Sequence, residues 1–455
     1  MRAALDPGPR GALVAEPRPA KPSAPGRDGP YAWYVVVVMC LGFTFSYMDR
    51  SILPLLIGPL ERSLHLTDTT VALLQGAAFA IFYALFGLPL ARVADRSHRR
   101  NLILVGVVAW SLATVACGLA QSVVQLLAAR VCVAIGEAVL APAAVSVIAD
   151  YFTPRWRTRA LSLYSMGVFF GGGLSLSLGG ALLRALGPQA QIATPFGLLE
   201  SWRIVFITLG AAGAILVPLL LAVREPPRVA DGGESAGEPA SLAELGRTFA
   251  RKRGALFTTI IGFATIALGA QTVQVWAPTL FVRVHGWSIA GAGQRMGAFT
   301  IVLGPLGALT GAFLAERLER AGRSDGKIVV GLVSASLCVA ASLLATAGAE
   351  QVAFAGVVAM QYVVAFNFGL VQAALAELLP NRMRAVGSAC YVAASNLLAA
   401  TLGPLLVGLL NDHLFRDPAM IATSIRCVAP VAFLAAALIM LWGRRSYRDQ
   451  ISLNP

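Results

Sequence analysis

Long apolar stretches decide what this chain can fold into. A helix needs about 20 mostly apolar residues to cross the hydrocarbon core of a bilayer, and 12 segments of the sequence meet this requirement. They cover residues 32–60, 69–91, 101–120, 123–149, 159–185, 202–223, 254–282, 294–315, 327–347, 351–377, 386–411 and 424–443. Only 13% of the residues are charged, about half the share of a typical soluble protein. The sequence therefore predicts an all-α membrane protein with twelve transmembrane helices.

The chain also contains an internal repeat. Connections between the predicted helices are short except at 224–253, which separates two sets of six helices. The stretch ADYFTPRWRTRALSL (149–163), after the fourth helix, is echoed by AELLPNRMRAVGS (376–388), after the tenth. More weakly, ARVADRSHRR (91–100) is echoed by AFLAERLERAGR (312–323). Two repeated six-helix halves are typical of transporters whose site lies between the halves.

This organisation predicts five regions along the chain. They are a disordered cytoplasmic tail (1–30), an N-terminal six-helix bundle (31–223), a linker (224–253), a C-terminal six-helix bundle (254–443) and a second cytoplasmic tail (444–455). In the linker, Leu242, Leu245 and Phe249 recur at helical spacing among basic residues, which predicts a short amphipathic helix on the membrane surface. The first tail lacks the apolar core of a cleaved signal sequence.

Membrane topology accounts for the net charge of +13 without nucleic acid as a partner. With the N-terminus inside, the inner segments hold 27 of the 36 Lys and Arg residues and the outer loops hold 7. This asymmetry predicts that both termini lie in the cytoplasm. The six cysteines lie in apolar segments without metal-ligand spacing, and the four histidines lie in or next to loops. No metal or other cofactor is expected.

Four ionisable residues lie inside predicted helices, where a charge costs about 2.5–3.5 kcal/mol on insertion scales. Asp49 and Arg50 lie in the first helix, and Arg130 and Glu137 lie in the fourth. Arg130 and Glu137 are 7 residues apart and therefore share one helical face. Because the two helices run in opposite directions, Asp49 and Arg130 can lie at similar depth, with Glu137 nearer the midplane. The four charges sum to zero, so we expect them to compensate one another around a shared cavity.

Each of these four residues has a candidate role. Burial disfavours the charged form of a carboxyl group, which suits proton exchange, so Glu137 is the first candidate for proton coupling. Asp49 is the second, because the adjacent cation would hold it ionised. Arg130 and Arg50 are candidate ligands for an anionic head group, with Arg130 the better placed, and we assign Glu137 to the same substrate site. The alternative for all four is a purely structural polar clamp.

The predicted helices of the C-terminal half offer amides instead of buried charges. They are Gln271, Gln274, Gln361, Asn367, Gln372 and Asn396. Of these, Gln271, Gln274 and Asn367 are candidate substrate ligands, although amides in membrane helices also serve helix packing. This distribution suggests coupling chemistry in the first half and polar recognition in the second.

The loop 91–100 resembles the loop motif of the major facilitator superfamily. Its charged residues Asp95, Arg96 and Arg99 match that motif, whereas the usual glycines are replaced. In the family these charges join the two halves on the cytoplasmic side, which implies an inner gate here.

Two further patterns resemble the Spinster branch of that superfamily, including its bacterial members. They are YMDRSILP in the first helix and the Arg130 to Glu137 segment, RVCVAIGE, in the fourth. The resemblance is close over residues 31–185 and continues mainly through topology. It implies a monomeric, proton-coupled transporter of a bacterial inner membrane that moves an amphipathic lipid, such as a lysophospholipid or sphingoid lipid, by alternating access. Organic-anion symporters carry related patterns, so a proton-coupled symporter of small organic anions is the alternative.

Matching charges follow the fourth and tenth helices. Asp150 and Glu377 lie at the cytoplasmic ends of these helices, with Arg159 and Arg384 after them. We expect ion pairs of the inner gate there, with solvation of the helix ends as the alternative.

Other classes of protein fit the sequence less well. An intramembrane enzyme would need a buried Ser/His/Asp or paired-Asp constellation, and the sequence has none in its apolar segments. A receptor or scaffold would leave the buried carboxylates and repeated motifs without a purpose. The absence of a Gly-rich phosphate loop argues against transport driven by ATP.

Overall fold

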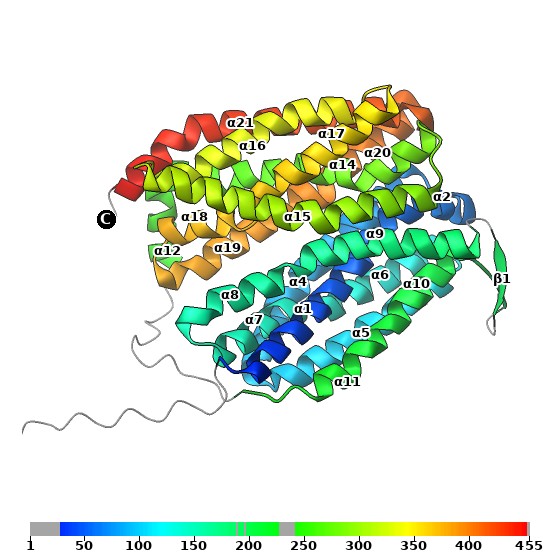
Figure 1. Ribbon diagram of the computed structural model, residues 1–455, viewed down its shortest axis with the longest axis horizontal. Coiled ribbons are helices and arrows are strands. Elements are labelled where there is room, and N and C mark those ends of the chain that lie inside the picture. The colour runs from blue at the N-terminus through cyan, green and yellow to red at the C-terminus, as the bar shows by residue number, and fades with distance from the viewer. Residues whose placement is uncertain (1–27, 188–189, 195–196, 227–241, 453–455) are drawn as a thin grey trace, which may run out of the picture.

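The computed structural model describes residues 28–187, 190–194, 197–226 and 242–452. Within these ranges, the description excludes the side chains of Leu88, Ala91, Ala94, Asp95, Arg96, Leu242, Ala243, Asn381, Arg382 and Ala385. The described part contains 12 helices long and apolar enough to cross a membrane, which confirms the predicted spans. Figure 1 shows the two halves of the chain lying side by side as two helical bundles.

Several spans are built from more than one helical segment. The N-terminal half contains α1 (Pro30–Ser51), α2 (Leu53–Leu64), α3 (Asp68–Ala72), the π-helical η1 (Leu73–Ala77), α4 (Ala78–Arg96), α5 (Arg99–Leu119), α6 (Val123–Glu137), α7 (Leu140–Tyr151), α8 (Pro154–Ser165), α9 (Gly167–Leu186), α10 (Ser201–Ala212), η2 (Gly213–Ile215) and α11 (Leu216–Leu221). The C-terminal half follows the short helix α12 (Leu242–Arg251). It contains α13 (Arg253–Phe257), η3 (Thr258–Gly262), α14 (Phe263–Arg283), α15 (Ile289–Arg320), α16 (Gly326–Ala345), α17 (Glu350–Val364), η4 (Ala365–Asn367), α18 (Leu370–Leu378), α19 (Asn381–Ser395), η5 (Asn396–Leu402), α20 (Gly403–Leu409), η6 (Leu410–Phe415), η7 (Pro418–Met420) and α21 (Ile421–Ser452).

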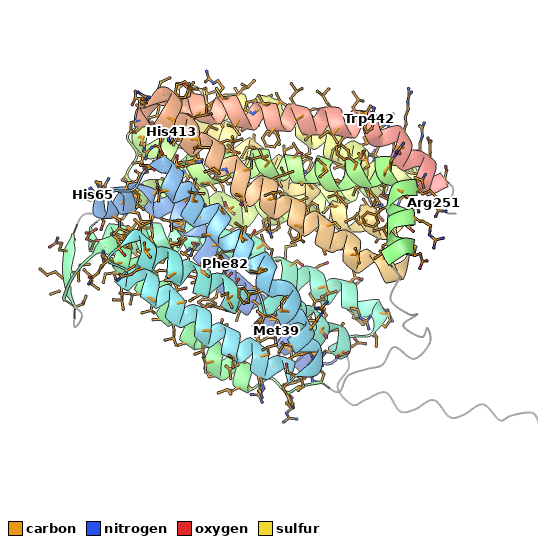
Figure 2. All side chains as sticks on the ribbon, turned by 180° about the vertical axis from the view of Figure 1, so that it is seen from behind. Met39, His65, Phe82, Arg251, His413 and Trp442 are labelled. Atoms are coloured by element: carbon orange, nitrogen blue, oxygen red, sulfur yellow. The ribbon has the colours of Figure 1, made fainter. Side chains whose placement is uncertain are left out.

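A β-hairpin that the sequence analysis did not predict identifies one side of the molecule. Strands β1 (Gln191–Thr194) and β2 (Gly197–Glu200) pair antiparallel between α9 and α10. We call this end the hairpin side and the opposite end, where α1 begins and α21 ends, the terminal side. In Figure 2, Arg251 lies at the terminal side, whereas His65 and His413 lie at the hairpin side.

The first span bends next to its charged pair. Helix α1 gives way to α2 at Ile52, and Pro54 has no N–H to donate to the carbonyl of Arg50, four residues earlier. The neighbouring carbonyl of Asp49 accepts a hydrogen bond from Arg130 Nη1 at 3.1 Å. The bend therefore exposes backbone acceptors that helix α6 can satisfy.

Each half has an apolar core of its own. Trp110 and Trp202 are fully buried in the core of the N-terminal half, and Trp276 and Phe433 are fully buried in that of the C-terminal half. One close approach of the two halves is the crossing of α9 and α15. A Cβ atom at Gly173 would lie 2.7 Å from the carbonyl oxygen of Gly297. This crossing therefore depends on the absence of a side chain.

The repeat predicted from the sequence extends to the capping of helix ends. Arg203, at the start of α10, donates to the carbonyls of Gly118 and Ala120 at the end of α5. Arg426, at the corresponding place in α21, donates to the hydroxyl and carbonyl of Thr346 at the end of α16. Cations at helix C-termini stabilise the free carbonyls there.

The two regions that flank the C-terminal bundle are helical. Helix α21 continues to Ser452, so most of the predicted tail 444–455 extends the last span. A short helix, α12, forms where the sequence predicts one, and its Leu245 and Phe249 pack against the core of the C-terminal half. The remainder of the predicted linker, 227–241, and residues 1–27 of the first tail lie outside the described residues.

Candidate functional site: a charged cavity between the halves

A cavity of about 480 Å³ lies between the two halves. From the N-terminal half, Arg50 and Arg130 line it, and from the C-terminal half the amides Gln271, Gln274 and Asn367 do so. The structure thus brings these five predicted site residues to one cavity. Glu137 and Asp49 lie behind the cavity wall and do not line it. The placement of Glu137 therefore differs from its assignment to the substrate site.

The principal ion pair of the site joins Arg50 and Glu137. Arg50 Nε donates to Glu137 Oε2 at 2.7 Å, and the Ser46 hydroxyl donates to the same oxygen at 2.8 Å. The Glu137 side chain is completely buried, whereas the Arg50 side chain is 24% exposed. Arg50 therefore separates the carboxylate from the cavity.

Aromatic rings of the second span fix the position of Arg50. Its guanidinium carbon lies 4.5 Å from the ring centroids of both Phe79 and Tyr83, and 5.6 Å from that of Tyr47. Phe79 and Tyr83 are one helical turn apart on α4, so they present one surface. Cation–π contacts of this kind stabilise a guanidinium that has left bulk water.

Asp49 has a different environment from its neighbour Arg50. The Thr114 hydroxyl donates to Asp49 Oδ2 at 2.6 Å, and none of the described residues hydrogen-bonds to Oδ1. Successive helical residues point about 100° apart, so Arg50 faces Glu137 while Asp49 faces α5. Arg50 thus pairs with Glu137 rather than with Asp49, and Arg130 donates to the Asp49 backbone carbonyl.

The amides of the C-terminal half form a partly satisfied polar wall. Gln274 Nε2 donates to Gln361 Oε1 at 3.0 Å. Asn367 Nδ2 donates to the Ser334 hydroxyl at 2.8 Å, while its Oδ1 has no partner among the described residues. Gln271 lines the cavity beside them. These groups can hydrogen-bond a polar solute without adding charge to the site.

On the terminal side, a network within the N-terminal half surrounds Arg99. Arg99 Nε lies 2.7 Å from Glu225 Oε1, and its Nη1 lies 2.5 Å from Asp150 Oδ2. The backbone N–H of Arg100 also donates to Glu225. Burial disfavours the charge of Glu225, but these hydrogen bonds outweigh burial and lower its pKa.

The C-terminal half contains a matching network around Lys327. Lys327 Nζ lies 2.5 Å from Glu377 Oε1 and also contacts Glu319. The Tyr447 hydroxyl donates to the other Glu377 oxygen at 2.7 Å. Arg99 and Lys327 each begin a corresponding span, so the two networks follow the internal repeat.

These contacts correct the ion pairs expected for the inner gate. Asp150 and Glu377 pair within their own halves, with Arg99 and Lys327. Arg159 instead lies over the Trp156 ring at 4.7 Å, and Arg384 donates to the Leu379 carbonyl. Both arginines belong to the helices that follow, α8 and α19. The side chains of Asp95 and Arg96 lie outside the described residues.

The neutral partners of the charged cluster were not predicted from the sequence. Ser46 precedes Arg50 by one turn, and that spacing indicates a shared face. Thr114 lies in the uncharged stretch 101–120, and Phe79 and Tyr83 lie in the uncharged stretch 69–91, so no neighbouring charge marks them. Among the described residues, no group of three or more His, Cys, Asp and Glu side chains could hold a metal ion.

Comparisons with known proteins agree with this architecture. A model of the Major Facilitator Superfamily matches residues 39–404. An MFS-type efflux pump of Mycolicibacterium smegmatis is 30% identical over 436 residues, 93% of this chain and 96% of that protein. Protein spinster homolog 1 of Homo sapiens is 25% identical over 415 residues, 87% of this chain and 75% of that protein.

A solved structure supports the same relationship. The crystal structure of a bacterial homolog to the human lysosomal transporter Spinster, in an inward-facing and unoccupied conformation, matches with a TM-score of 0.75 and 27% identity. The match covers 93% of this chain and 97% of that chain. This chain therefore belongs to the major facilitator superfamily, within which it is a Spinster-like, multi-pass transporter rather than an enzyme.

Proposed function

We propose that this protein is a proton-coupled secondary transporter that moves an amphipathic lipid, of lysophospholipid or sphingoid type, by alternating access. It would work as a monomer in a bacterial inner membrane, with the terminal side in the cytoplasm. The observation that carries the proposal is the cavity between the halves, which has a buried cluster of ionisable residues behind one wall. Buried charges in membrane helices mark substrate and proton pathways.

The composition of the cavity wall supports an amphipathic substrate. Phe169, Phe299 and Phe368 line the cavity together with Arg50 and Arg130. Apolar rings suit an acyl or sphingoid chain, and guanidinium groups suit an acidic head group. The lipid class itself follows from the resemblance to Spinster proteins.

We assign proton coupling to Asp49 and Glu137 acting in sequence. Each carboxylate has one oxygen without a partner among the described residues, but Glu137 accepts from the Arg50 guanidinium, whereas Asp49 accepts from the neutral Thr114 hydroxyl. Asp49 can therefore hold a proton while Glu137 stays ionised. When a substrate anion takes over the hydrogen bond from Arg50, Glu137 loses its partner, and a buried unpaired carboxylate takes up a proton.

A second candidate function is proton-coupled symport of small organic anions. Arg50 and Arg130 both line the cavity, and protonation of both carboxylates would leave two positive charges for an anionic substrate. This chemistry needs no acyl chain in the cavity.

Proton movement in proteoliposomes separates the two functions. A pH dye would report flux after addition of lysophospholipid, and then of a panel of small organic acids. We expect a signal with lysophospholipid that Glu137→Gln and Asp49→Asn abolish. Glu316→Gln is the matched control, because Glu316 is 57% exposed and pairs with Arg320 on α15. A signal only with organic acids would favour the second candidate, and unchanged flux in Glu137→Gln would contradict the role of Glu137.

A further inference from the structure

A network of five polar residues joins the two halves on the hairpin side. Its members are Glu61 and Asp68 from the N-terminal half and Arg283, Asn411 and Asp412 from the C-terminal half. We call these five residues the hairpin-side network. None of the five is a predicted site residue, and the transport chemistry proposed above does not use them.

Arg283 is the centre of the network. Its Nη2 lies 2.7 Å from both oxygens of Glu61 and 2.8 Å from Asp68 Oδ1, and its Nη1 lies 2.9 Å from Asp68 Oδ2. The side chains of Arg283 and Glu61 are less than one-fifth exposed, and that of Asp68 is 4% exposed. One guanidinium thus holds two carboxylates from different helices, α2 and α3, to the end of α14.

Further contacts across the same boundary depend on this arrangement. Asn411 Nδ2 donates to Asp68 Oδ2 at 2.8 Å, and Asp412 Oδ2 accepts from the backbone N–H of Thr69 at 2.7 Å. A Cβ atom at Gly408 would lie 2.9 Å from the Asp68 carbonyl oxygen. The backbones of α20 and α3 are therefore in direct contact beside the ion pairs.

The network lies beyond one end of the cavity. Pro54 lines the cavity, and Glu61 lies seven residues further along α2, or about 10 Å towards the hairpin side. Ala277 lines it from α14, and Arg283 lies six residues further, or about 9 Å. The same two helices that form the cavity walls thus carry the ion pairs that join the halves beyond it.

We propose that Arg283 holds the cavity closed on the hairpin side, and that outward opening requires it to release Glu61 and Asp68 together. The proposal rests on the alternating access proposed above. Because both carboxylates share one guanidinium, neither helix can leave alone without leaving a charge unpaired. The arrangement makes opening an all-or-none step.

The charges predict what removal of Arg283 does. Without it, Glu61 and Asp68 face each other with no cation between them, and like charges repel. Repulsion between residues that hold the halves together shifts the population towards the outward-open state. Neutralising Glu61 in the same protein removes that repulsion, so the second substitution reverses much of the first.

Alkylation of a cysteine in the cavity measures this opening without any substrate. The six native cysteines are free and would be replaced, and Thr300→Cys would place a thiol in the cavity wall. A membrane-impermeant maleimide is added from the hairpin side, and Ala419→Cys, in the exposed connection before α21, verifies that the reagent reaches that side. We expect Arg283→Gln to raise the rate of Thr300→Cys labelling by about tenfold, within the usual range of coupling between two conformations.

Two further variants make the result specific. Glu61→Gln in the Arg283→Gln protein should bring the rate most of the way back. Arg295→Gln should leave it unchanged, because Arg295 is also an arginine of the hairpin side but pairs with Glu350 of its own half. An unchanged rate in folded Arg283→Gln protein would overturn the proposal.

The proposal can still be tested if the Arg283→Gln protein does not fold. If Arg283→Gln yields no folded protein, Arg283→Lys keeps the charge but cannot fork onto both carboxylates, and it should still raise the labelling rate. Labelling equal to that of the unsubstituted protein would overturn the proposal in that case. Because labelling needs no substrate, failure of the proton-flux experiment would count against the proposed function alone.

Discussion

Arg50 meets two structural requirements at once. Its guanidinium accompanies the fully buried Glu137 carboxylate, and it lies against the faces of Phe79 and Tyr83. The aromatic contacts need only a flat cation, whereas Glu137 needs a hydrogen-bond donor. A substrate can therefore compete for the donor without displacing Arg50 from the rings.

The ion pair should be visible in stability measurements. Arg50→Met leaves Glu137 buried without a cation, and breaking a buried pair costs about 3–5 kcal/mol, less here because Arg50 borders the cavity. We expect the double variant Arg50→Met/Glu137→Gln to recover most of this loss. Thermal unfolding in detergent, monitored by tryptophan fluorescence, measures the loss in the single variant and the recovery in the double variant. Equal midpoints for the single and double variants would contradict the assignment.

Glu225 makes the stability of the folded protein depend on pH in a defined direction. Hydrogen bonds from Arg100 and Arg99 lower its pKa in the folded protein, so its contribution to stability is present above the pKa of an unfolded glutamate. That contribution is lost as the pH falls through the folded pKa. Glu225→Gln should lower the midpoint of thermal unfolding at pH 7, and the difference should shrink below about pH 4. A difference that does not change with pH would exclude this ionic role.

At the scale of elements, the crossing of α9 and α15 is a close contact between the halves. A Cβ atom at Gly173 would lie 2.3 Å from Ile301 Cγ1 as well as close to the Gly297 carbonyl. Gly172, its neighbour on α9, has nothing nearer than 3.7 Å. Adjacent glycines on one helix therefore have opposite tolerance for a methyl group.

This contrast supplies a matched pair of substitutions. Gly173→Ala should destabilise the protein by about 1–3 kcal/mol, because overpacking forces the two helices apart. Gly172→Ala should be neutral, or stabilising by up to about 1 kcal/mol through helix propensity. Thermal unfolding midpoints of the two variants, measured under the same conditions, test the prediction. A similar loss of stability in Gly173→Ala and Gly172→Ala would show that close packing at the crossing is not the cause of the destabilisation.

The sequence predicts the elements better than the contacts between them. Apolar length is a local property, so all twelve spans could be located. The rotation of a helix about its axis is set by packing, and this decides that Arg50 rather than Asp49 meets Glu137. Asp68 and Arg283 were missed for another reason: each lies at a helix end, where charges are ordinary in sequence, and only the fold brings them together.

At the scale of the whole molecule, most of the core packing lies within each half. One apolar core belongs to the N-terminal half, and the other belongs to the C-terminal half apart from Ile57, Val71 and Ala72. The terminal-side networks around Arg99 and Lys327 each stay within one half. We therefore expect residues 1–230 and 238–455, co-expressed as separate chains, to assemble and to support proton flux. Co-purification through a tag on one chain measures assembly. If the two chains do not associate, the connecting segment is needed for assembly of the halves.

The charge balance of the buried cluster has an electrical consequence. Asp49, Glu137, Arg50 and Arg130 sum to zero when both carboxylates are ionised, so a carrier without proton or substrate moves no net charge from this cluster when it changes conformation. A single bound proton leaves one positive charge, and moving it through the full membrane potential is worth about 2.3 kcal/mol per 100 mV. In capacitive current recordings, the return of the empty carrier should therefore be electrically silent. The membrane voltage would then act on the proton-loaded step alone, and would set the direction in which that step proceeds.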